Sequence, residues 1–209
     1  MPAIPLKTPL LSPGDDIIET ARAALDRVGV RPEPADILAI CESPLAITEG
    51  RVVEVDRLDV GVPARVLNRL MDADSSLGTV YGMQTAIDVA GLPRLLLAVA
   101  AGAVGHLLRR EGDFYRVAGR QVAWIDDITG TMPPYTQDII LGPSDPDGVA
   151  HQAAAVFGCG AAVVDANDLG GVEIMGASPG IDRDLLVEHM RRNPQGNDDE
   201  QTPLVLVRP

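Results

Sequence analysis

Apolar residues recur at helical spacing in several stretches of the chain, and the first stretch is the clearest. Residues Ile17 to Val28 place isoleucine, alanine and leucine side chains on one side, with Asp15 and Asp16 before them and Gly29 after them. Acids at the start of a helix and glycine at its end are common caps, so the pattern predicts a helix over 16–28. The same reasoning predicts helices over 62–74, 92–108, 144–158 and 178–194.

Shorter apolar runs bounded by turn residues predict strands. Such runs lie at 4–11, 36–42, 50–58, 137–143, 160–165 and 202–207, and a hairpin is predicted from 114–117 and 121–125. Helices and strands mix irregularly, which predicts an α/β or α+β fold with mixed sheets and packed helices. The length of 209 residues fits one domain over 1–209, with room for a smaller lobe.

The most hydrophobic stretch, "LPRLLLAVAAGAVGHLL" at 92–108, is too short and too broken by glycine for a membrane span, which needs roughly 20 apolar residues. We therefore predict a buried helix. Its alanine and glycine surface would allow another helix or a sheet to approach closely, so an assembly role for this helix stays open.

Charge and composition limit the classes of partner that the protein is expected to bind. Seventeen basic residues against thirty acidic ones give a net charge of −13, which disfavours nucleic acids and anionic membranes. Lys7 is the one lysine, so an anionic ligand elsewhere would need arginine, a divalent cation or backbone N–H groups. Cys41 and Cys159 lie far apart in apolar surroundings and are predicted to be free thiols. The opening "MPAIPLKTPL" does not resemble a secretory signal, so the cytoplasm is the expected compartment.

Two segments carry acids directly after an apolar run. In "WIDDITGTMPPY" these acids are Asp126 and Asp127, and in "VVDANDLGG" the polar residues are Asp165, Asn167 and Asp168. Carboxylate and amide oxygens suit Mg²⁺ or Mn²⁺, which often bridge to the phosphates of a substrate. The alternative is that these side chains cap turns, since aspartate and asparagine followed by glycine are common in loops. Both interpretations stay open.

A third segment, "SDPDGVAHQ", begins a predicted helix whose unpaired N–H groups could bind phosphate. Asp145 and Asp147 already place negative charge there, which favours simple capping. His106, His151 and His189 lack the spacing of a zinc site.

Several motifs, in the same order along the chain, resemble the coenzyme F420-0:L-glutamate ligase family, the gamma-glutamyl ligases. "IPLKTPLLSPGDDI" looks like the opening of the family, "DILAICESPLAITEGRVV" like its strand leading to Ser-Lys-x-Glu-Gly-Arg, and "LGPSDPDGVA" like its Leu-Pro-x-Asp-Pro-Asp helix start. "AAVVDANDLGG" takes the place of the strand end that carries the Asp-Thr of the metal site in the family.

The resemblance implies a homodimer, GTP, and Mg²⁺ or Mn²⁺, with a glutamate amine attacking an activated carboxylate of a small-molecule substrate. It places nucleotide contacts at Gly14, Glu49, Gly50 and Arg51. It places metal ligands at Asn167 and Asp168. The Asp-Arg-Ser-Asn segment that gives another metal aspartate in the family is not recognisable, and we expect Asp126 and Asp127, the acids in that region, to be the metal ligands in its place. Glu49 is expected to position the neighbouring loop.

Departures from the family pattern keep a second hypothesis open. When the chain is aligned with the family motif on the shared "EGR", Ala46 and Ile47 stand in place of the family serine and lysine, and Ser43 stands in place of an earlier lysine. The loss of lysines in so acidic a chain weakens the case for GTP, although it leaves the fold prediction intact. The first hypothesis is a divergent metal- and nucleotide-dependent gamma-glutamyl ligase acting on an F420-0-like or other carboxylate acceptor. The second is a non-catalytic domain that binds a small anionic metabolite or a partner.

Overall fold

The computed structural model describes the chain except residues 1–2, 74, 127–132, 168 and 197–199. The chain forms two compact units. The first contains residues 1–51 and 143–209, and the second contains residues 52–142 between them. Both have helices and strands, which confirms the predicted mixed α/β fold.

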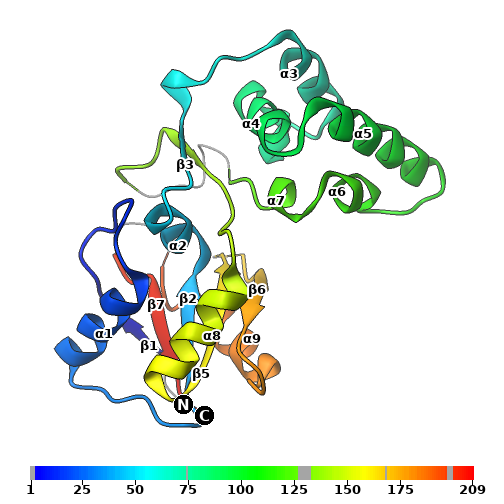
Figure 1. Cartoon of the computed structure of the whole chain (residues 1–209). Coiled ribbons are helices and arrows are strands. Elements are labelled where there is room, and N and C mark those ends of the chain that lie inside the picture. The colour runs from blue at the N-terminus through cyan, green and yellow to red at the C-terminus, as the bar shows by residue number, and fades with distance from the viewer. Residues whose placement is uncertain (1–2, 74, 127–132, 168, 197–199) are drawn as a thin grey trace. The chain divides into compact units, whose positions relative to one another are not determined.

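The first unit is built on a five-stranded sheet with the order β1-β7-β2-β5-β6 (Figure 1). Strands β2 and β5 run parallel, and the other neighbouring strands run antiparallel. The strands are β1 (Ala3–Leu6), β2 (Ile37–Cys41), β5 (Gly160–Ala166), β6 (Val172–Ala177) and β7 (Leu204–Val207).

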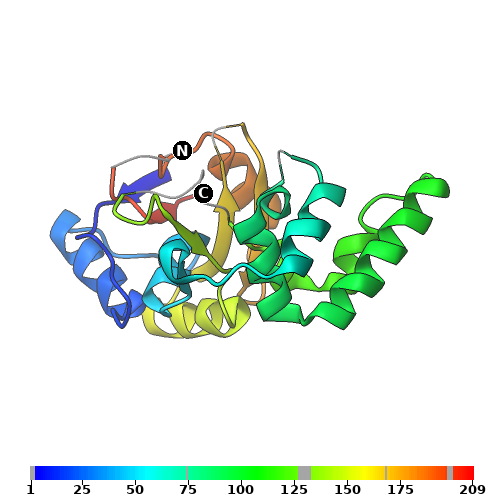
Figure 2. The ribbon, with the colours of Figure 1, turned by 90° about the horizontal axis from the view of Figure 1, so that it is seen from above.

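Helices cover both faces of this sheet. Helix α9 (Arg183–Met190) packs Leu186 and Met190 against alternate residues of the central strands, including Ala39 and Val164. Helix α8 (Pro146–Phe157) lies against β5 and β6 on the other face, as the view from above shows (Figure 2). Helices α1 (Ile17–Val28) and α2 (Glu42–Thr48) complete the unit.

Local caps explain why the first predicted helix forms where it does. The Asp16 carboxylate accepts hydrogen bonds from the Ile18 and Glu19 N–H groups, and Gly29 ends the helix in the left-handed region at φ 67°. Aspartate satisfies N–H groups that the first helical turn leaves unpaired, and glycine adopts the left-handed conformation without strain.

Strands β5 and β6 contain an irregularity that sets their register. Val163 pairs with Gly176, but the next residue, Val164, pairs with Ile174, so Met175 is the extra residue of a β-bulge. Beyond this bulge Asp165 lies directly opposite Glu173.

The second unit is mainly helical. Its strands β3 (Val52–Glu54) and β4 (Asp138–Ile140) form an antiparallel pair. Its helices are α3 (Val62–Leu67), α4 (Val80–Ala90), α5 (Leu92–Leu107), α6 (Asp113–Ala118) and α7 (Arg120–Ala123), with 3-10 turns at Val55–Arg57, Asn68–Leu70 and Ser76–Gly78.

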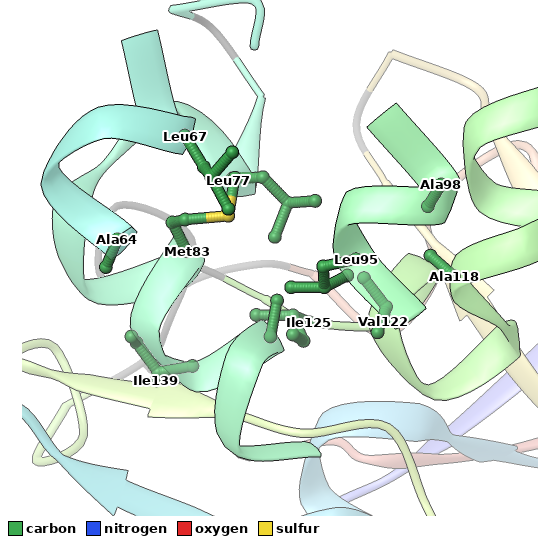
Figure 3. Packing of buried hydrophobic residues seen from close by; sticks show 11 residues of the cluster. Ala64, Leu67, Leu77, Met83, Leu95, Ala98, Ala118, Val122, Ile125 and Ile139 are labelled. Carbon is green, nitrogen blue, oxygen red and sulfur yellow. The ribbon is translucent and has the colours of Figure 1, made fainter. Parts of the chain in front are cut away.

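This unit has its own apolar core. In Figure 3, Leu67, Leu77 and Met83 meet at one side of the core, while Leu95, Val122 and Ile125 meet at the other. Ile139 of β4 is also fully buried in this cluster. Such a cluster, formed within one unit, is typical of a compact region with its own stability.

Two predictions about this unit are wrong. The hairpin predicted at 114–117 and 121–125 is instead α6 and α7, separated by Gly119 at φ 102°, a conformation that favours glycine. The helix predicted at 92–108 forms, but it is not buried: Leu97 and Leu107 are 66% and 82% exposed.

Several other predictions are confirmed in the first unit. Strands form within 36–42 and 202–207 and over the predicted 160–165, where the strand extends to Ala166, and helices form within 144–158 and 178–194. Within the described residues, no single helix combines the length and the apolar composition needed to cross a membrane.

Candidate functional site

The carboxyl ends of β2 and β5 lie at the same edge of the main sheet. The two strands are parallel and in register, with Cys41 opposite Val164. The chain leaves β2 into Glu42 and leaves β5 through Asp165 and Asn167, so polar side chains from distant parts of the sequence meet at one edge. Ligands of open α/β sheets commonly bind at this kind of edge.

Two carboxylates face each other across the β5–β6 pair. Asp165 and Glu173 are register partners, and their side chains point to the same face of the sheet. The Asp165 side chain is exposed, and its pKa is raised above its ordinary value, first by partial desolvation against neighbouring atoms and then by the nearby Glu173 charge. Like charges directly opposite each other destabilise a sheet, and a bound cation would relieve the repulsion.

Cys41 and Glu42 extend the acidic character of this edge. Burial, and then the charges of Glu42 and Asp165, raise the pKa of the Cys41 thiol to about 12. The Ser43 hydroxyl donates a hydrogen bond of 2.6 Å to the Glu42 carboxylate, which is buried. Cys41 is therefore a neutral thiol at neutral pH and is poorly suited to act as a nucleophile.

Asn167 organises the loop that joins β5 to β6. Its side-chain oxygen accepts hydrogen bonds from the Leu169 N–H at 3.1 Å and from the Gly171 N–H at 2.8 Å. An amide oxygen has two lone pairs, and both are used here. The structure thus gives Asn167 the loop role that the turn interpretation predicts, and a metal ligand in this loop would have to come from another side chain.

Glu49 links the end of α2 to the start of the α8 segment. Its carboxylate accepts a hydrogen bond of 2.7 Å from the Ser144 N–H, 95 residues along the chain. The N–H groups of Gly14 and Gly50 donate to the carbonyls of Thr48 and Ile47. A phosphate bound at these two glycines would have to displace those hydrogen bonds. The guanidinium of Arg51, which is half-buried, is therefore a more suitable phosphate contact in this loop than the two N–H groups.

The residues in the positions of the family serine and lysine face the interior. Ala46 and Ile47 lie in α2 and are fully buried, where they join the core of the first unit. A lysine at position 47 would place its charge in this apolar environment, which is costly without a partner. The apolar packing around α2 therefore accounts for Ala46 and Ile47 in place of the family serine and lysine.

Asp126 lies in the second unit and does not follow a strand. It comes after α7 and forms an isolated bridge with Ile140, in which the two residues exchange backbone hydrogen bonds of 2.8 and 3.1 Å. Asp127 and Asp168, the other two predicted metal ligands, lie outside the described residues. In the described part of the chain, no group of three or more histidine, cysteine, aspartate or glutamate side chains forms a ready-made metal site.

The acids at the start of α8 are structural, as the capping interpretation predicts. The Asp145 carboxylate accepts a hydrogen bond of 3.0 Å from the Gly148 N–H and caps the helix. The Asp147 carboxylate accepts one of 3.0 Å from the Ala177 N–H and ties the helix to β6. These bonds fix the first turn of α8 against the sheet.

The first unit therefore belongs to the class of mixed α/β proteins with an acidic edge beyond parallel strands. A family model described as F420-0:Gamma-glutamyl ligase matches residues 5–156. This match covers most of the chain, and the chain belongs to that family. Membership indicates gamma-glutamyl ligase activity and a role in coenzyme biosynthesis. No curated protein matches the chain at a significant level.

The polar residues at the β5 end of this edge are predicted from the sequence, whereas Glu173 is not. The segment "GGVEIMGA" contains this glutamate without any motif around it. A hairpin register drawn back from the "NDLGG" loop would have indicated the pairing of Asp165 with a residue near 173, because the loop is short.

Proposed function

We propose that the protein is a metal- and nucleotide-dependent gamma-glutamyl ligase acting on an F420-0-like or related carboxylate acceptor in the cytoplasm. The observation that carries this proposal is the family match over residues 5–156, together with the Asp165–Glu173 pair at the end of the parallel strands. The family supplies the reaction class, and the pair supplies negative charge where a cation is needed.

In the proposed reaction the acceptor carboxylate takes the terminal phosphoryl group of the nucleotide, giving an acyl phosphate and a nucleoside diphosphate. The glutamate amino nitrogen then attacks the acyl carbon. The carbon–oxygen bond to phosphate breaks, inorganic phosphate leaves with the bonding electrons, and the nitrogen loses a proton as the amide forms. Phosphorylation makes a carboxylate oxygen a good leaving group, which is the reason such a ligase needs a nucleotide.

The chain fits a divalent cation at the β5–β6 pair. Asp165 and Glu173 would hold it, and Asp168 is a further ligand predicted from the sequence. Mg²⁺ commonly uses one or two protein carboxylates and takes its other oxygen ligands from water and phosphate, so two facing acids suffice. When bound, the metal would neutralise charge between phosphate groups.

The raised pKa of Asp165 belongs to the protein without a cation, and a cation held between Asp165 and Glu173 would lower this pKa by stabilising the charged carboxylate. Arg51 is the proposed contact for nucleotide phosphate, with Glu49 positioning its loop through Ser144.

The test is calorimetric titration with Mn²⁺, then with GTP and with ATP in the presence of Mn²⁺. We expect saturable Mn²⁺ binding by the wild type and at least tenfold weaker binding by Asp165→Asn and Glu173→Gln. The control is Asp26→Asn, which removes an exposed acid in α1 away from this edge. Wild-type protein that binds neither metal nor nucleotide would contradict the proposal.

A second candidate function rests on the buried Ala46 and Ile47. Without the family lysine, the edge could bind a small anionic metabolite or a partner without turnover. Glutamate-dependent release of phosphate from the nucleotide separates the two functions. Ligand binding without phosphate release, using F420-0 and other carboxylate acceptors, would favour the binding function.

A further inference from the structure

The chain between α9 and β7 is tied to the carboxyl edge of the main sheet at two points. The Gln195 side-chain amide donates a hydrogen bond of 3.0 Å to the carbonyl of Ala166, the last residue of β5. The Cys41 N–H, at the end of β2, donates one of 2.8 Å to the Pro203 carbonyl. This connection therefore contacts the ends of both parallel strands.

The bond from Gln195 reaches β5 where the neighbouring strand has already ended. Strand β2 stops opposite Val164, two residues before β5 ends. The Asn167 N–H donates to the Gly171 carbonyl, and bonded pairs alternate in an antiparallel ladder, so the Ala166 carbonyl points away from β6. The Gln195 amide supplies a donor to this carbonyl.

The carbonyl held by Gln195 lies next to a proposed cation ligand. Ala166 follows Asp165 in β5, and Asp165 lies opposite Glu173. A shift or rotation of the backbone at Ala166 would carry the Asp165 side chain with it. The bond from Gln195 therefore affects how the two carboxylates face each other.

The side-chain oxygen of Gln195 has no hydrogen-bond partner in the part of the chain that the structure describes. The residue is only 8% exposed. The bond from Nε2 to the Ala166 carbonyl fixes the orientation of the amide, because the reverse orientation would place two oxygens together. A buried acceptor without a donor generally costs more free energy than one neutral hydrogen bond contributes. The amide of Gln195 therefore adds no net stability by itself.

We propose that Gln195 is a positioning residue of the candidate cation site, holding the end of β5 so that Asp165 stays opposite Glu173. Local features that lower stability are typical of functional sites. Groups that orient a metal ligand influence metal affinity although they do not touch the metal. This role rests on the proposed function, because it requires a cation at the pair. Family membership does not assign it, since Gln195 lies outside the matched residues 5–156.

The backbone of Gln195 is held in place, as a positioning role requires. The Thr202 hydroxyl donates a hydrogen bond to the Gln195 carbonyl. A Cβ atom added at Gly170 would lie 4.0 Å from the Arg191 carbonyl oxygen, so the β5–β6 loop also lies close to the chain that follows α9. A side chain on a fixed backbone positions its partner more precisely than one on a mobile backbone.

The first test compares the wild type with Gln195→Met by calorimetric titration of the full-length protein with Mn²⁺. Methionine has nearly the length of glutamine but lacks both the donor and the unpaired oxygen. We expect Gln195→Met to bind Mn²⁺ about tenfold more weakly, as is typical when a group that orients a metal ligand is lost. The urea midpoint should stay the same or rise, because removal of the unpaired oxygen offsets the lost bond. A lower urea midpoint with unchanged Mn²⁺ affinity would show a merely structural role and overturn the inference.

The matched control is the same substitution at Gln84, in α4 of the second unit. The Gln84 side chain accepts a hydrogen bond of 3.0 Å from the Gly61 N–H and donates one of 2.8 Å to Asp88. Gln84→Met should lower the urea midpoint and leave the Mn²⁺ affinity unchanged. An equal loss of affinity in both methionine variants would mean that the effect does not act through β5, and the positioning role would be rejected.

A second variant, Gln195→Asn, keeps the test decisive if Gln195→Met does not fold. Asparagine retains the amide but is shorter by one methylene group, so its donor no longer reaches the Ala166 carbonyl from the same backbone position. We expect a similar loss of Mn²⁺ affinity and a changed electron paramagnetic resonance spectrum of the bound Mn²⁺. Affinity and spectrum equal to those of the wild type would contradict the proposed role.

Amide hydrogen exchange without metal measures the hold on β5 directly. The N–H groups of Asn167 and Gly171 should exchange faster in Gln195→Asn than in the wild type, because the adjoining strand end has lost a hydrogen bond. Unchanged exchange at both positions would show that the strand end is held without Gln195, which is incompatible with the inference.

The wild type separates the positioning role from the proposed function. Wild-type protein that binds no Mn²⁺ would contradict the proposed cation site and the role of Gln195 together. Wild-type binding that the Gln195 variants leave unchanged would overturn the role of Gln195 alone.

Discussion

Asp165 is the residue on which the candidate site depends most directly. Its raised pKa means that the folded protein binds a proton at this position more readily than the unfolded chain does. Its contribution to stability is therefore greatest at acidic pH and decreases as pH rises from the ordinary aspartate value through the raised value.

The direction of this pH dependence gives a prediction for Asp165→Asn. In metal-free buffer the variant should become more stable relative to the wild type between pH 4 and pH 7, because it lacks the unfavourable charge beside Glu173. Urea denaturation at both pH values measures the difference. Saturating Mn²⁺ should reverse the order at pH 7 by stabilising only the wild type. If Mn²⁺ stabilises both proteins equally, Asp165 is not a ligand.

The thiols give a second prediction at the same scale. Burial raises the pKa of Cys41 to about 12 and that of Cys159 to about 11, so both remain protonated at pH 8. Native protein should react with iodoacetamide more than about a hundredfold slower than the same protein in guanidinium chloride, since the thiolate is the reactive form. Mass spectrometry of quenched samples counts the modified cysteines, and rapid labelling of Cys41 in native protein would show that it ionises near pH 8.

Among the helices and strands, the sequence best predicts those helices whose capping residues lie next to them in the chain. Asp16 and Gly29 bracket α1, and Asp145 caps α8, so both helices are predictable from a few neighbouring residues. The hairpin predicted at 114–125 is wrong because Gly119 separates two short helices, and a glycine in a turn favours neither element by itself.

The candidate site was only partly predictable, because one of its two acids is placed by strand pairing and not by its neighbours in the sequence. The polar residues after β5 follow an apolar strand and are visible in the sequence. The partner of Asp165 is set by the β5–β6 register, which is a tertiary property. The role of Asn167 was also open, because the same amide oxygen suits either a metal or the N–H groups of a loop.

The contact between α8 and β6 can be tested by substitution. A Cβ atom added at Gly176 would overlap the Pro146 and Asp147 backbone, much closer than van der Waals contact allows. We expect Gly176→Ala to reduce the free energy of unfolding by at least about 1 to 3 kcal/mol, as overpacking does. The control is Gly61→Ala, whose Cβ would have its nearest neighbours at 3.5 Å. Equal stability of the two variants by urea denaturation would show that α8 can shift without cost.

At the scale of the whole molecule, the chain continues from the first unit into the second and returns. Residues 52–142 have their own core, and both strands of the β3–β4 pair lie within them. The described acids of the proposed metal pair, Asp165 and Glu173, both lie in the first unit. The proposed cation pair is therefore separate from the core formed within residues 52–142.

A chain in which residues 52–142 are replaced by a glycine-serine linker tests this separation. We expect it to keep the sheet of the first unit and to bind Mn²⁺ within a few-fold of the full-length affinity. Circular dichroism and calorimetry measure the two properties, and Asp165→Asn in the shortened chain is the control. A folded product that fails to bind Mn²⁺ would contradict the assignment of the cation to the first unit.

The bulge at Met175 has a consequence for how this site could be gained or lost. In an uninterrupted ladder, Val164 would face Met175 and Asp165 would face Ile174, so that Glu173 would point to the opposite side of the sheet. The two acids therefore face each other because the ladder skips Met175, and deleting Met175 would keep this pairing in a regular ladder. A relative that pairs the residue at position 175 instead of skipping it would hold the two acids on opposite sides of the sheet with every acidic letter preserved.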